Sequence, residues 1–210
     1  METKALRAQM NPHFIFNTLN GIQSVMILQG EQAANKYLVS FSKLLRFTLD
    51  MNNLEFISLK NEINYLKSYL ELESLRLNHN IEYIFDVSND IDNINIPCML
   101  FQPIIENAII HGLLPKKEDR KLHISMTLKN DILIGKVTDN GIGRDASQIR
   151  KKKNKANHKS WATHIMNERI NISNSLHKEK ISFEIIDLKQ GEKSIGTEAI
   201  LYIFIKKDEY

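Results

Sequence analysis

The stretch "KLHISMTLKNDILIGKVTDNG", residues 121–141, contains two segments in which apolar and polar residues alternate. The first runs from Leu122 to Leu128, and Asn130 and Asp131 separate it from the second. Alternation with a period of two places apolar side chains on one face of a strand, and an Asn-Asp pair favours a tight turn. The stretch therefore predicts a β-hairpin with one face on a hydrophobic core.

Further strands are predicted on both sides of this hairpin. The segment "IEYIFDV" at 81–87 has the same alternation. The segments "ISFEIIDL" at 181–188 and "AILYIFI" at 199–205 are predicted to form a second strand pair, with Gly191 in the loop between them. Helical segments at 100–113 and 160–177 fall between strands. Because strands and helices with one apolar face pack in layers, this half is predicted to be α+β, a mixed or antiparallel sheet covered by helices on one face.

Before residue 78, apolar residues recur at helical spacing instead. Helices are predicted at 4–29, 33–51 and 58–76, the first two forming an antiparallel hairpin, and Gly30 is suited to end the first. The stripe expected to be buried in the second helix is Leu38, Phe41, Leu44, Leu45 and Leu49. The change of period divides the chain into a helical domain, residues 1–77, and an α+β domain, residues 78–210.

Composition is that of a soluble globular protein. Hydrophobic residues make up 42% and charged residues 25% of the 210 residues, and the formal net charge is +3. A charge this small gives no support to a nucleic-acid partner. Cys98 is the single cysteine and no run of 18 apolar residues occurs, so the chain is predicted to be cytoplasmic, without revealing whether it is part of a membrane-bound protein.

A histidine stands out in "MNPHFIFNTLNGI", residues 10–22. On a helical projection the apolar side is Phe14, Ile15, Leu19, Ile22, Val25 and Met26, and the opposite side is His13, Asn17, Asn20 and Ser24. His13 therefore heads a polar stripe and does not belong to the expected core face. Pro12 either kinks this helix or begins it after an Asn11 cap, and both interpretations stay open.

Two further segments carry polar residues suited to a nucleotide. "QPIIENAIIHG", residues 102–112, brings an acid, an amide and an imidazole within two helical turns, a set that can hold hydrated Mg²⁺ and phosphate oxygens or can be ordinary surface polarity. "TDNGIG", residues 138–143, places an Asp at a strand end before two glycines, which fits either a nucleotide site or a plain turn.

The order and spacing of these segments resemble the LytS/YehU-type sensor histidine kinases. "LRAQMNPHFIFNTLNGI" resembles their phosphoacceptor region and "LKNEINYLKSYLELESLRL" the helix that follows. "QPIIENAIIHG" is similar to the N box, and "DNGIG" to the G1 box, of GHKL-type (HATPase_c) ATPases. The resemblance spans Leu6 to Ile205 and implies a helical hairpin that dimerises into a four-helix bundle, followed by a GHKL-type α/β sandwich.

The resemblance also implies roles for individual residues. His13 would be the phosphoacceptor, with Asn17 as its nearest polar neighbour. Asn107 would ligate the Mg²⁺ that bridges the ATP phosphates. Glu106 would assist through a metal-bound water or the catalytic proton, and His111 would shape the phosphate region.

The adenine end of the nucleotide would meet the second motif. Asp139 would accept a hydrogen bond from the adenine amino group, and Gly141 and Gly143 would give clearance. Thr197 would support Asp139 through a water molecule. The phosphoryl group on the histidine would pass to an aspartate of a response regulator, which in this family is typically of the LytTR type.

Two departures stand out. Many histidine kinases carry an acid immediately after the histidine as general base, whereas Phe14 follows His13 here, as is usual in the LytS/YehU-type family, so the general base is unassigned. When "NERI" at 167–170 is aligned with the family pattern, Ala162 falls on a glycine position of the ATP lid. If that glycine requires φ > 0, alanine would be strained there. The lid carries the basic residues Arg150, Lys151, Lys152, Lys153, Lys155 and Lys159, which either form a solvated loop or attract phosphate.

The alternatives to an active kinase are a nucleotide-binding pseudokinase and a non-catalytic dimeric scaffold for a response regulator. A nucleic-acid binder working through residues 150–159 is disfavoured because the cluster lacks interleaved aromatic residues. The full-length protein is expected to be anchored in the membrane through a region that precedes this chain.

Overall fold

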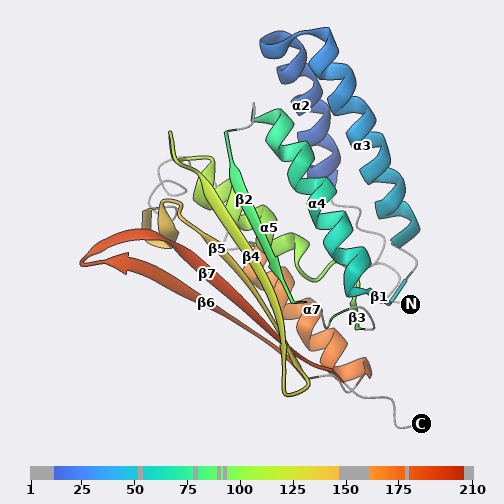
Figure 1. The fold of residues 1–210 in the computed structure, drawn as a ribbon, viewed down its shortest axis with the longest axis vertical. Helices are drawn as coiled ribbons and strands as arrows, with labels where there is room; N and C mark the ends of the chain where they lie inside the picture. Colours follow the sequence, from blue (N-terminus) through green and yellow to red (C-terminus); the bar gives the residue numbers. More distant parts are fainter. Residues whose placement is uncertain are drawn as a thin grey trace.

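The computed structural model describes residues 12–51, 54–77, 80–88, 91, 94–146, 161–177 and 180–205, and for 12–17, 161–165, 169, 176 and 177 the backbone alone. The helices are α2 (Pro12–Gln29), α3 (Glu31–Met51), α4 (Leu59–Arg76), α5 (Gln102–Asn107), the π-helix η1 (Ala108–Leu113) and α7 (Trp161–His177). The strands are β1 (Phe56–Ser58), β2 (Glu82–Val87), β3 (Asn95–Pro97), β4 (Lys121–Lys129), β5 (Ile132–Asp139), β6 (Ile181–Gln190) and β7 (Lys193–Phe204). A hairpin of two helices stands beside a twisted sheet (Figure 1).

The main sheet is mixed, as the alternating segments predicted. Its strands lie in the order β2-β4-β5-β7-β6, with β2 parallel to β4 and the other neighbours antiparallel. Asn130 and Asp131 make the turn between β4 and β5 with φ of 51° and 60°, values that Asn and Asp tolerate better than most residues. β7 is longer than predicted because it pairs with β6 as far as Gln190 and Lys193.

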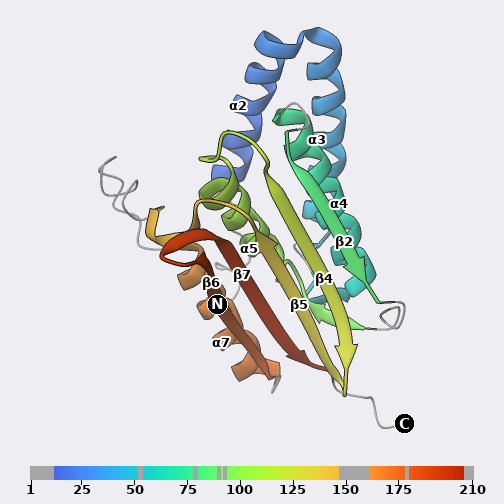
Figure 2. The same cartoon turned by 60° about the vertical axis from the view of Figure 1, so that its left-hand side comes forward.

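Helices cover one face of this sheet, which confirms the predicted α+β arrangement. Helices α4, α5 and α7 lie behind the sheet when its open face is towards the viewer (Figure 2). Side chains on the covered face are buried, including Ile124 of β4, Val137 of β5 and Leu201 of β7. None of the described helices is both long and apolar enough to span a bilayer.

Helices α2 and α3 form the predicted hairpin, with Gly30 at the turn (φ 87°). The predicted buried stripe of α3 is wrong in part: Phe41 and Leu44 are buried, but Leu38 and Leu49 are 45% and 49% exposed. The buried positions that replace them are Tyr37 and Thr48. The face of α3 that packs within the chain is thus rotated from the apolar stripe, which leaves leucines on the outside.

The same displacement occurs in α2. Leu19 and Met26, which were expected in the core, are 50% and 51% exposed, whereas Thr18 and Gly21 are buried. A Cβ on Gly21 would lie 2.5 Å from the hydroxyl oxygen of Tyr37, so the two helices approach closely at this glycine. Close approach there decides which face of α2 is buried.

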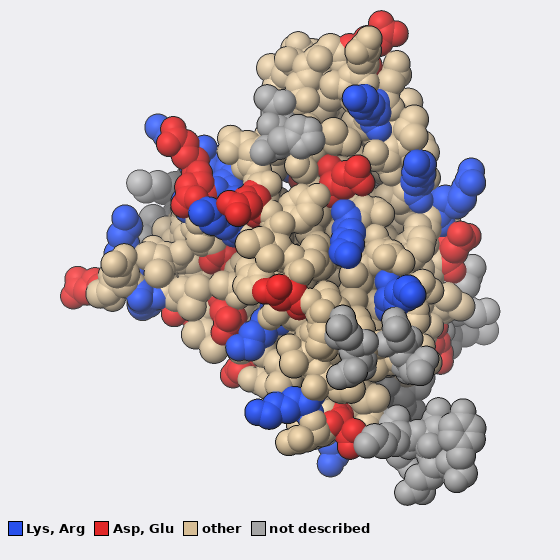
Figure 3. Space-filling view, in the orientation of Figure 1, with Lys and Arg blue, Asp and Glu red and all other residues tan. Residues whose placement is uncertain are grey.

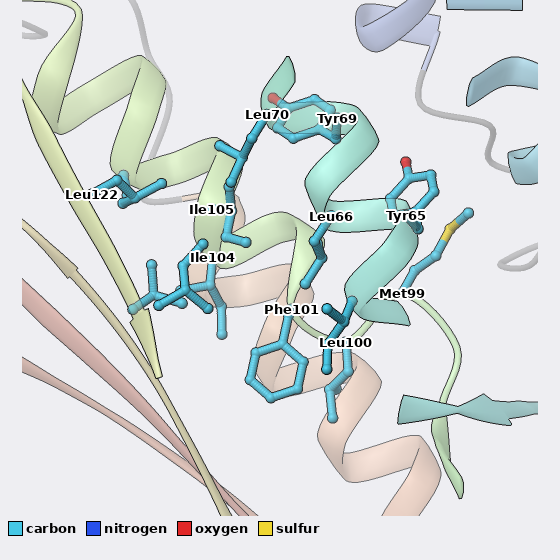
Figure 4. Close-up of a cluster of buried hydrophobic side chains, with 14 of the residues drawn as sticks. Tyr65, Leu66, Tyr69, Leu70, Met99, Leu100, Phe101, Ile104, Ile105 and Leu122 are labelled. Carbon is cyan, nitrogen blue, oxygen red and sulfur yellow. The ribbon is translucent and has the colours of Figure 1, made fainter. Parts of the chain in front are cut away.

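Helix α4 joins the hairpin to the sheet layer. Ser58 caps it by accepting a hydrogen bond from the amide of Asn61 at 3.2 Å. The strand before it, β1, pairs with β3, an element that the sequence did not predict because three residues are too few to show a period. On its other side α4 packs against the start of α5 through Leu66 and Phe101 (Figure 4). The division at residues 77 and 78 stays a prediction.

Candidate functional site

A pocket lies between α5, α7 and the covered face of the sheet. Its empty volume is about 380 Å³, part of it open to solvent. The residues that line it are Pro103, Ile104, Asn107, Ala108, Val137, Asp139, Met166, Phe183, Ile185, Thr197 and Ala199. Most of these side chains are apolar, and the polar ones come from α5, β5 and β7. A concave apolar site with a few convergent polar groups is the usual form of a small-molecule site.

Asp139 is the buried acid of this pocket. It ends β5 and is 2% exposed. One carboxylate oxygen, Oδ1, accepts a hydrogen bond from the Gly141 amide at 2.8 Å, and Oδ2 accepts one from the Thr197 hydroxyl. The resemblance implied a water between Thr197 and Asp139, whereas the contact is direct. Burial raises the pKa of Asp139, and the hydrogen bonds from Thr197 and Gly141 offset part of that rise.

The turn after Asp139 packs backbone against backbone. The amide of Ile142 donates to the Gly112 carbonyl oxygen at 3.1 Å. A Cβ on Gly141 would lie 2.3 Å from the carbonyl carbon of Gly112, and a Cβ on Gly112 would lie 2.6 Å from Asp139 Oδ1. Glycine is therefore required on both sides because the end of η1 is pressed onto the turn that holds Asp139.

Gly141→Ala is expected to lower the free energy of unfolding by about 2 kcal/mol, since two backbone segments must separate to admit the methyl group. The matched control is Gly191→Ala, where φ is 62° but no atom lies within 4 Å of the added Cβ. Backbone strain alone should cost that control about 1 kcal/mol. Urea unfolding measures both, and a Gly141→Ala cost no larger than the control would contradict the close-packing argument.

The acid and amide of "QPIIENAIIHG", Glu106 and Asn107, stand at the end of α5. Asn107 lines the pocket, and Glu106 Oε1 accepts a hydrogen bond from Gln102 Nε2 at 2.8 Å. The helix then continues as a π-helix, in which the Leu114 amide bonds to the Ile109 carbonyl oxygen at 2.8 Å. The sequence predicted one regular helix here. His111 lies in this wider turn and, unlike Asn107, is not among the described residues that line the pocket.

No group of three or more His, Cys, Asp or Glu side chains within the described ranges could hold a metal ion. A divalent cation at this site would therefore take few ligands from the protein. That fits Mg²⁺, which usually keeps several waters and is held by one or two protein oxygens together with phosphate oxygens. Asn107 offers such an oxygen in the pocket, and Glu106, its neighbour in α5, is not among the residues that line the pocket.

Comparison with known proteins gives the family. Residues 1–81 match the family model described as Histidine kinase. Sensor histidine kinase YpdA of Escherichia coli is 30% identical over 203 residues, which cover 96% of this chain and 34% of YpdA. Sensor protein LytS of Staphylococcus epidermidis is 30% identical over 148 residues, 70% of this chain and 25% of LytS. The chain belongs to the histidine kinase family.

The fold agrees with that assignment. The histidine kinase domain of the blue-light activated histidine kinase of Erythrobacter litoralis EL346 matches with a TM-score of 0.50 at 12% identity, covering 96% of this chain and 91% of that one. This structural match confirms the α+β architecture, and the family model and the relatives confirm the resemblance. Because the chain spans about a third of YpdA and a quarter of LytS, the histidine kinase described here corresponds to only part of its curated relatives.

In this histidine kinase, the backbone of His13 and Asn17 lies in α2, and their side chains lie outside the described set. Two other members of the predicted polar stripe, Asn20 and Ser24, are exposed. The polar stripe is thus on the outside of α2 where side chains are described. The role of His13 stays a proposal.

The lid prediction is only partly open to inspection. Ala162, placed by the sequence on a glycine position, lies in α7, so its backbone is helical and the expected strain is not found. The basic residues between Arg150 and Lys159 lie outside the described ranges.

The sequence did not predict the apolar walls of the pocket. Met166, Phe183 and Ile185 line it, yet each reads as an ordinary core residue in the sequence. The available signal was the alternation in β6, where Ile185 pairs with Ala199 on the covered face. Gly196 is a second such position: its sequence context gives no signal, but its φ is 146° and a Cβ there would lie 1.9 Å from the Asp139 carbonyl oxygen.

Proposed function

We propose that this chain is the phosphoacceptor and ATP-binding core of a two-component sensor histidine kinase. It would bind ATP in the pocket, transfer the γ-phosphoryl group to His13, and pass it on to an aspartate of a response regulator. The observation that carries the proposal is the buried acceptor Asp139 in an apolar pocket. ATP as the donor is what membership of the histidine kinase family implies.

The adenine ring fits the chemistry of the pocket. A purine has two flat apolar faces and an amino group that donates hydrogen bonds, and the pocket offers apolar walls with one carboxylate. Because Thr197 and Gly141 already orient the Asp139 carboxylate, its acceptor positions are fixed before the base arrives. Oδ2, the oxygen that the Gly141 amide does not use, would accept the hydrogen bond from the adenine amino group.

The phosphates and the metal are proposed to lie towards the end of α5. Asn107 and Glu106 would contribute oxygens to Mg²⁺, and His111 would contact the phosphate region. When bound, Mg²⁺ neutralises charge on the phosphate oxygens. Gly141 and Gly143 would keep the nearby backbone clear of side chains, although Ser194 already occupies the space that a Cβ on Gly143 would take.

The transfer itself requires His13 in line with the γ-phosphate. An unprotonated imidazole nitrogen forms a bond to phosphorus as the bond to the bridging oxygen breaks and ADP leaves. The proton on the other ring nitrogen then leaves to a base. Glu106 is proposed to take part in that proton transfer, directly or through a water, while Asn17 orients the imidazole.

The test is incubation of the purified chain with γ-labelled ATP and Mg²⁺. The expected product is labelled protein whose label survives alkali and is lost in acid, as a phosphorus–nitrogen bond requires. Nucleotide binding is measured in parallel by calorimetry. ATP binding without any label would instead identify a nucleotide-binding scaffold, and slow labelling would identify a weak kinase. The reason for considering both is the unusual lid sequence, with Ala162 and its basic residues.

Dimerisation through the hairpin is proposed from its exposed apolar residues. These are Leu19 and Met26 on α2 and Leu38, Leu49 and the half-buried Leu45 on α3. Within each helix these residues lie along one stripe. If the hairpin were isolated in water, polar and charged residues would be expected on that stripe instead. The upper part of the hairpin is mostly uncharged on the face drawn in Figure 3. A second copy packed there would complete a four-helix bundle.

Leu38→Ala is expected to weaken that dimer roughly 30-fold. Truncating a half-exposed leucine removes about 1 kcal/mol of burial, and two-fold symmetry counts the residue twice. Sedimentation equilibrium measures the dimer constant. Ile84→Ala, 49% exposed on β2 of the sheet, is the control and should leave it unchanged. If Leu38→Ala and Ile84→Ala changed the dimer dissociation constant equally, Leu38 would not lie in the interface.

The partner and the setting follow from the relatives. We propose a response regulator receiver domain as acceptor, with a LytTR-type regulator suggested by the likeness to LytS. Direct binding of nucleic acid is not proposed. Since the curated relatives are longer than this chain, a membrane-anchored region of the full-length protein is proposed to precede it.

A further inference from the structure

Glu62 is a buried carboxylate outside the pocket. It lies in the first turn of α4 and is 0% exposed. Its Oε2 accepts a hydrogen bond from the Met99 amide at 3.0 Å, and its Oε1 accepts one from the Phe101 amide at 3.1 Å. Both oxygens of one side chain thus hold backbone from a segment nearly forty positions away in the chain.

The segment that Glu62 holds is the start of α5. Phe101 is the residue before this helix and its side chain makes no capping hydrogen bond. Met99 has φ of 56°, a conformation that a non-glycine residue keeps only when its surroundings impose it. Two bonds to a carboxylate of another helix supply that constraint and replace a local cap.

The helix α5 that begins there carries the proposed Mg²⁺ ligands. From Phe101 to Glu106 is little more than one helical turn, so a shift of the start is transmitted to Glu106 and Asn107. Figure 4 shows Leu70 of α4 beside Ile105 of α5, the residue before Glu106, and burial and, to a smaller extent, the charge of Glu106 raise the pKa of Tyr69 on α4. The two helices therefore face each other along the stretch that contains the motif.

Helix α4 is also in contact with the hairpin. Gln29 at the end of α2 donates to the Leu75 carbonyl oxygen at 3.1 Å, and the rings of Phe47 and Tyr65 stack with centroids 5.7 Å apart. Figure 4 shows Tyr65 and Leu66 of α4 beside the chain from Met99 to Phe101. One rigid helix thus touches the phosphoacceptor hairpin and the nucleotide motif.

We propose that Glu62 is a positioning residue that ties α5 to α4 and so makes the placement of Glu106 and Asn107 depend on the helix that packs on the hairpin. The proposal rests on the function proposed above, because the metal role of the two residues does. Glu62 touches neither nucleotide nor metal. Its effect is therefore expected in the coupling between Mg²⁺ and ATP and not in adenine binding.

The test compares ATP affinity with Mg²⁺ and in EDTA for the whole chain. Glu62→Gln retains one acceptor oxygen but turns an NH₂ group towards a backbone amide, and Glu62→Asp is shorter by one methylene. In either variant the affinity ratio, Mg²⁺ over EDTA, is expected to fall about tenfold, as loss of one buried hydrogen bond predicts. The affinity in EDTA should stay within about twofold, since six of the eleven residues that line the pocket, Asp139 among them, come from the sheet.

The control is Glu73→Gln on the same helix. Glu73 is also buried and bonds to Arg76 Nε at 3.0 Å, on the stretch of α4 that faces Tyr37 and Gly21 of the hairpin. It should keep the wild-type ratio. Equal weakening with and without Mg²⁺ in the Glu62 variants, or no change in the ratio, would overturn the proposal because the residue would then be merely structural or inert.

Amide hydrogen exchange without nucleotide separates this proposal from the proposed function. Residues 99–108 should exchange at least about tenfold faster in Glu62→Gln than in wild type or Glu73→Gln. Unchanged exchange overturns the link between α4 and α5, whatever the nucleotide does. If exchange accelerates but wild type binds ATP no better with Mg²⁺, the positional link stands and the proposed metal site fails.

Discussion

Replacing His13 with glutamine is expected to abolish phosphorylation of the chain while leaving its affinity for ATP unchanged. An amide nitrogen is not nucleophilic, so glutamine cannot accept the phosphoryl group although it has a similar size and polarity. The pocket residues all lie between Pro103 and Ala199, outside the hairpin, so binding should not respond. Label retained on the protein and calorimetric ATP titration measure the two quantities separately.

Asn20→Ala is the matched control, since Asn20 is exposed on the polar stripe predicted for His13. It should be labelled at the wild-type rate. Asn107→Ala should lose both label and Mg²⁺-dependent binding, because the proposed metal ligand is removed. Acid-labile label persisting in His13→Gln would mean that another histidine is the acceptor, and the assignment of His13 would be wrong.

The sheet was predictable because its strands are long and one-sided. Alternation in β4 and β5 and the Asn130-Asp131 turn determine a hairpin whatever surrounds it. The buried faces of α2 and α3 were not predictable in the same way. Both helices carry apolar residues on more than the face that is buried within the chain, so periodicity alone cannot tell which stripe is buried between the helices and which is exposed.

The candidate site divides along similar lines. Asp139, Asn107 and Thr197 were predicted from motifs, and the structure brings them to one pocket. Glu62 was not predicted, because a Glu one turn into an amphipathic helix is an ordinary surface residue until its backbone partners are known. The π-turn of η1 was missed for the same reason. Its sequence is a good α-helix, and only packing against the Asp139 turn distinguishes it.

Asp139→Asn is expected to weaken ATP binding by about 2–4 kcal/mol, a factor of roughly 30 to 1000 in Kd. The substituted amide keeps one acceptor oxygen, which the Gly141 amide already uses, and presents an NH₂ group where the adenine amino group would donate. Two donors then face each other in a buried site. Calorimetry or competition with a fluorescent nucleotide measures the loss.

The same substitution should raise the stability of the nucleotide-free protein at neutral pH. Burial raises the folded-state pKa of Asp139, so the ionised form is disfavoured by folding. The stability contributed by this carboxyl is therefore complete below its unfolded pKa and is lost as pH rises through the folded value. A neutral asparagine removes that loss, and it also removes the decline in ATP affinity expected on acidification, when Asp139 takes up a proton.

Asp187→Asn makes the opposite case with the same chemical change. Asp187 pairs with Arg144, with Nε to Oδ1 at 2.6 Å, and this partner lowers its pKa. Its contribution to stability is present above the unfolded pKa and lost on acidification, so asparagine should lower stability at neutral pH, by at most about 1 kcal/mol for an exposed pair. ATP binding should not change. Thermal unfolding at several pH values, with ATP titration at each, distinguishes the two variants. If Asp139→Asn lowers stability at neutral pH, or binds ATP as tightly as wild type does, the buried carboxylate stabilises the fold and does not serve nucleotide binding.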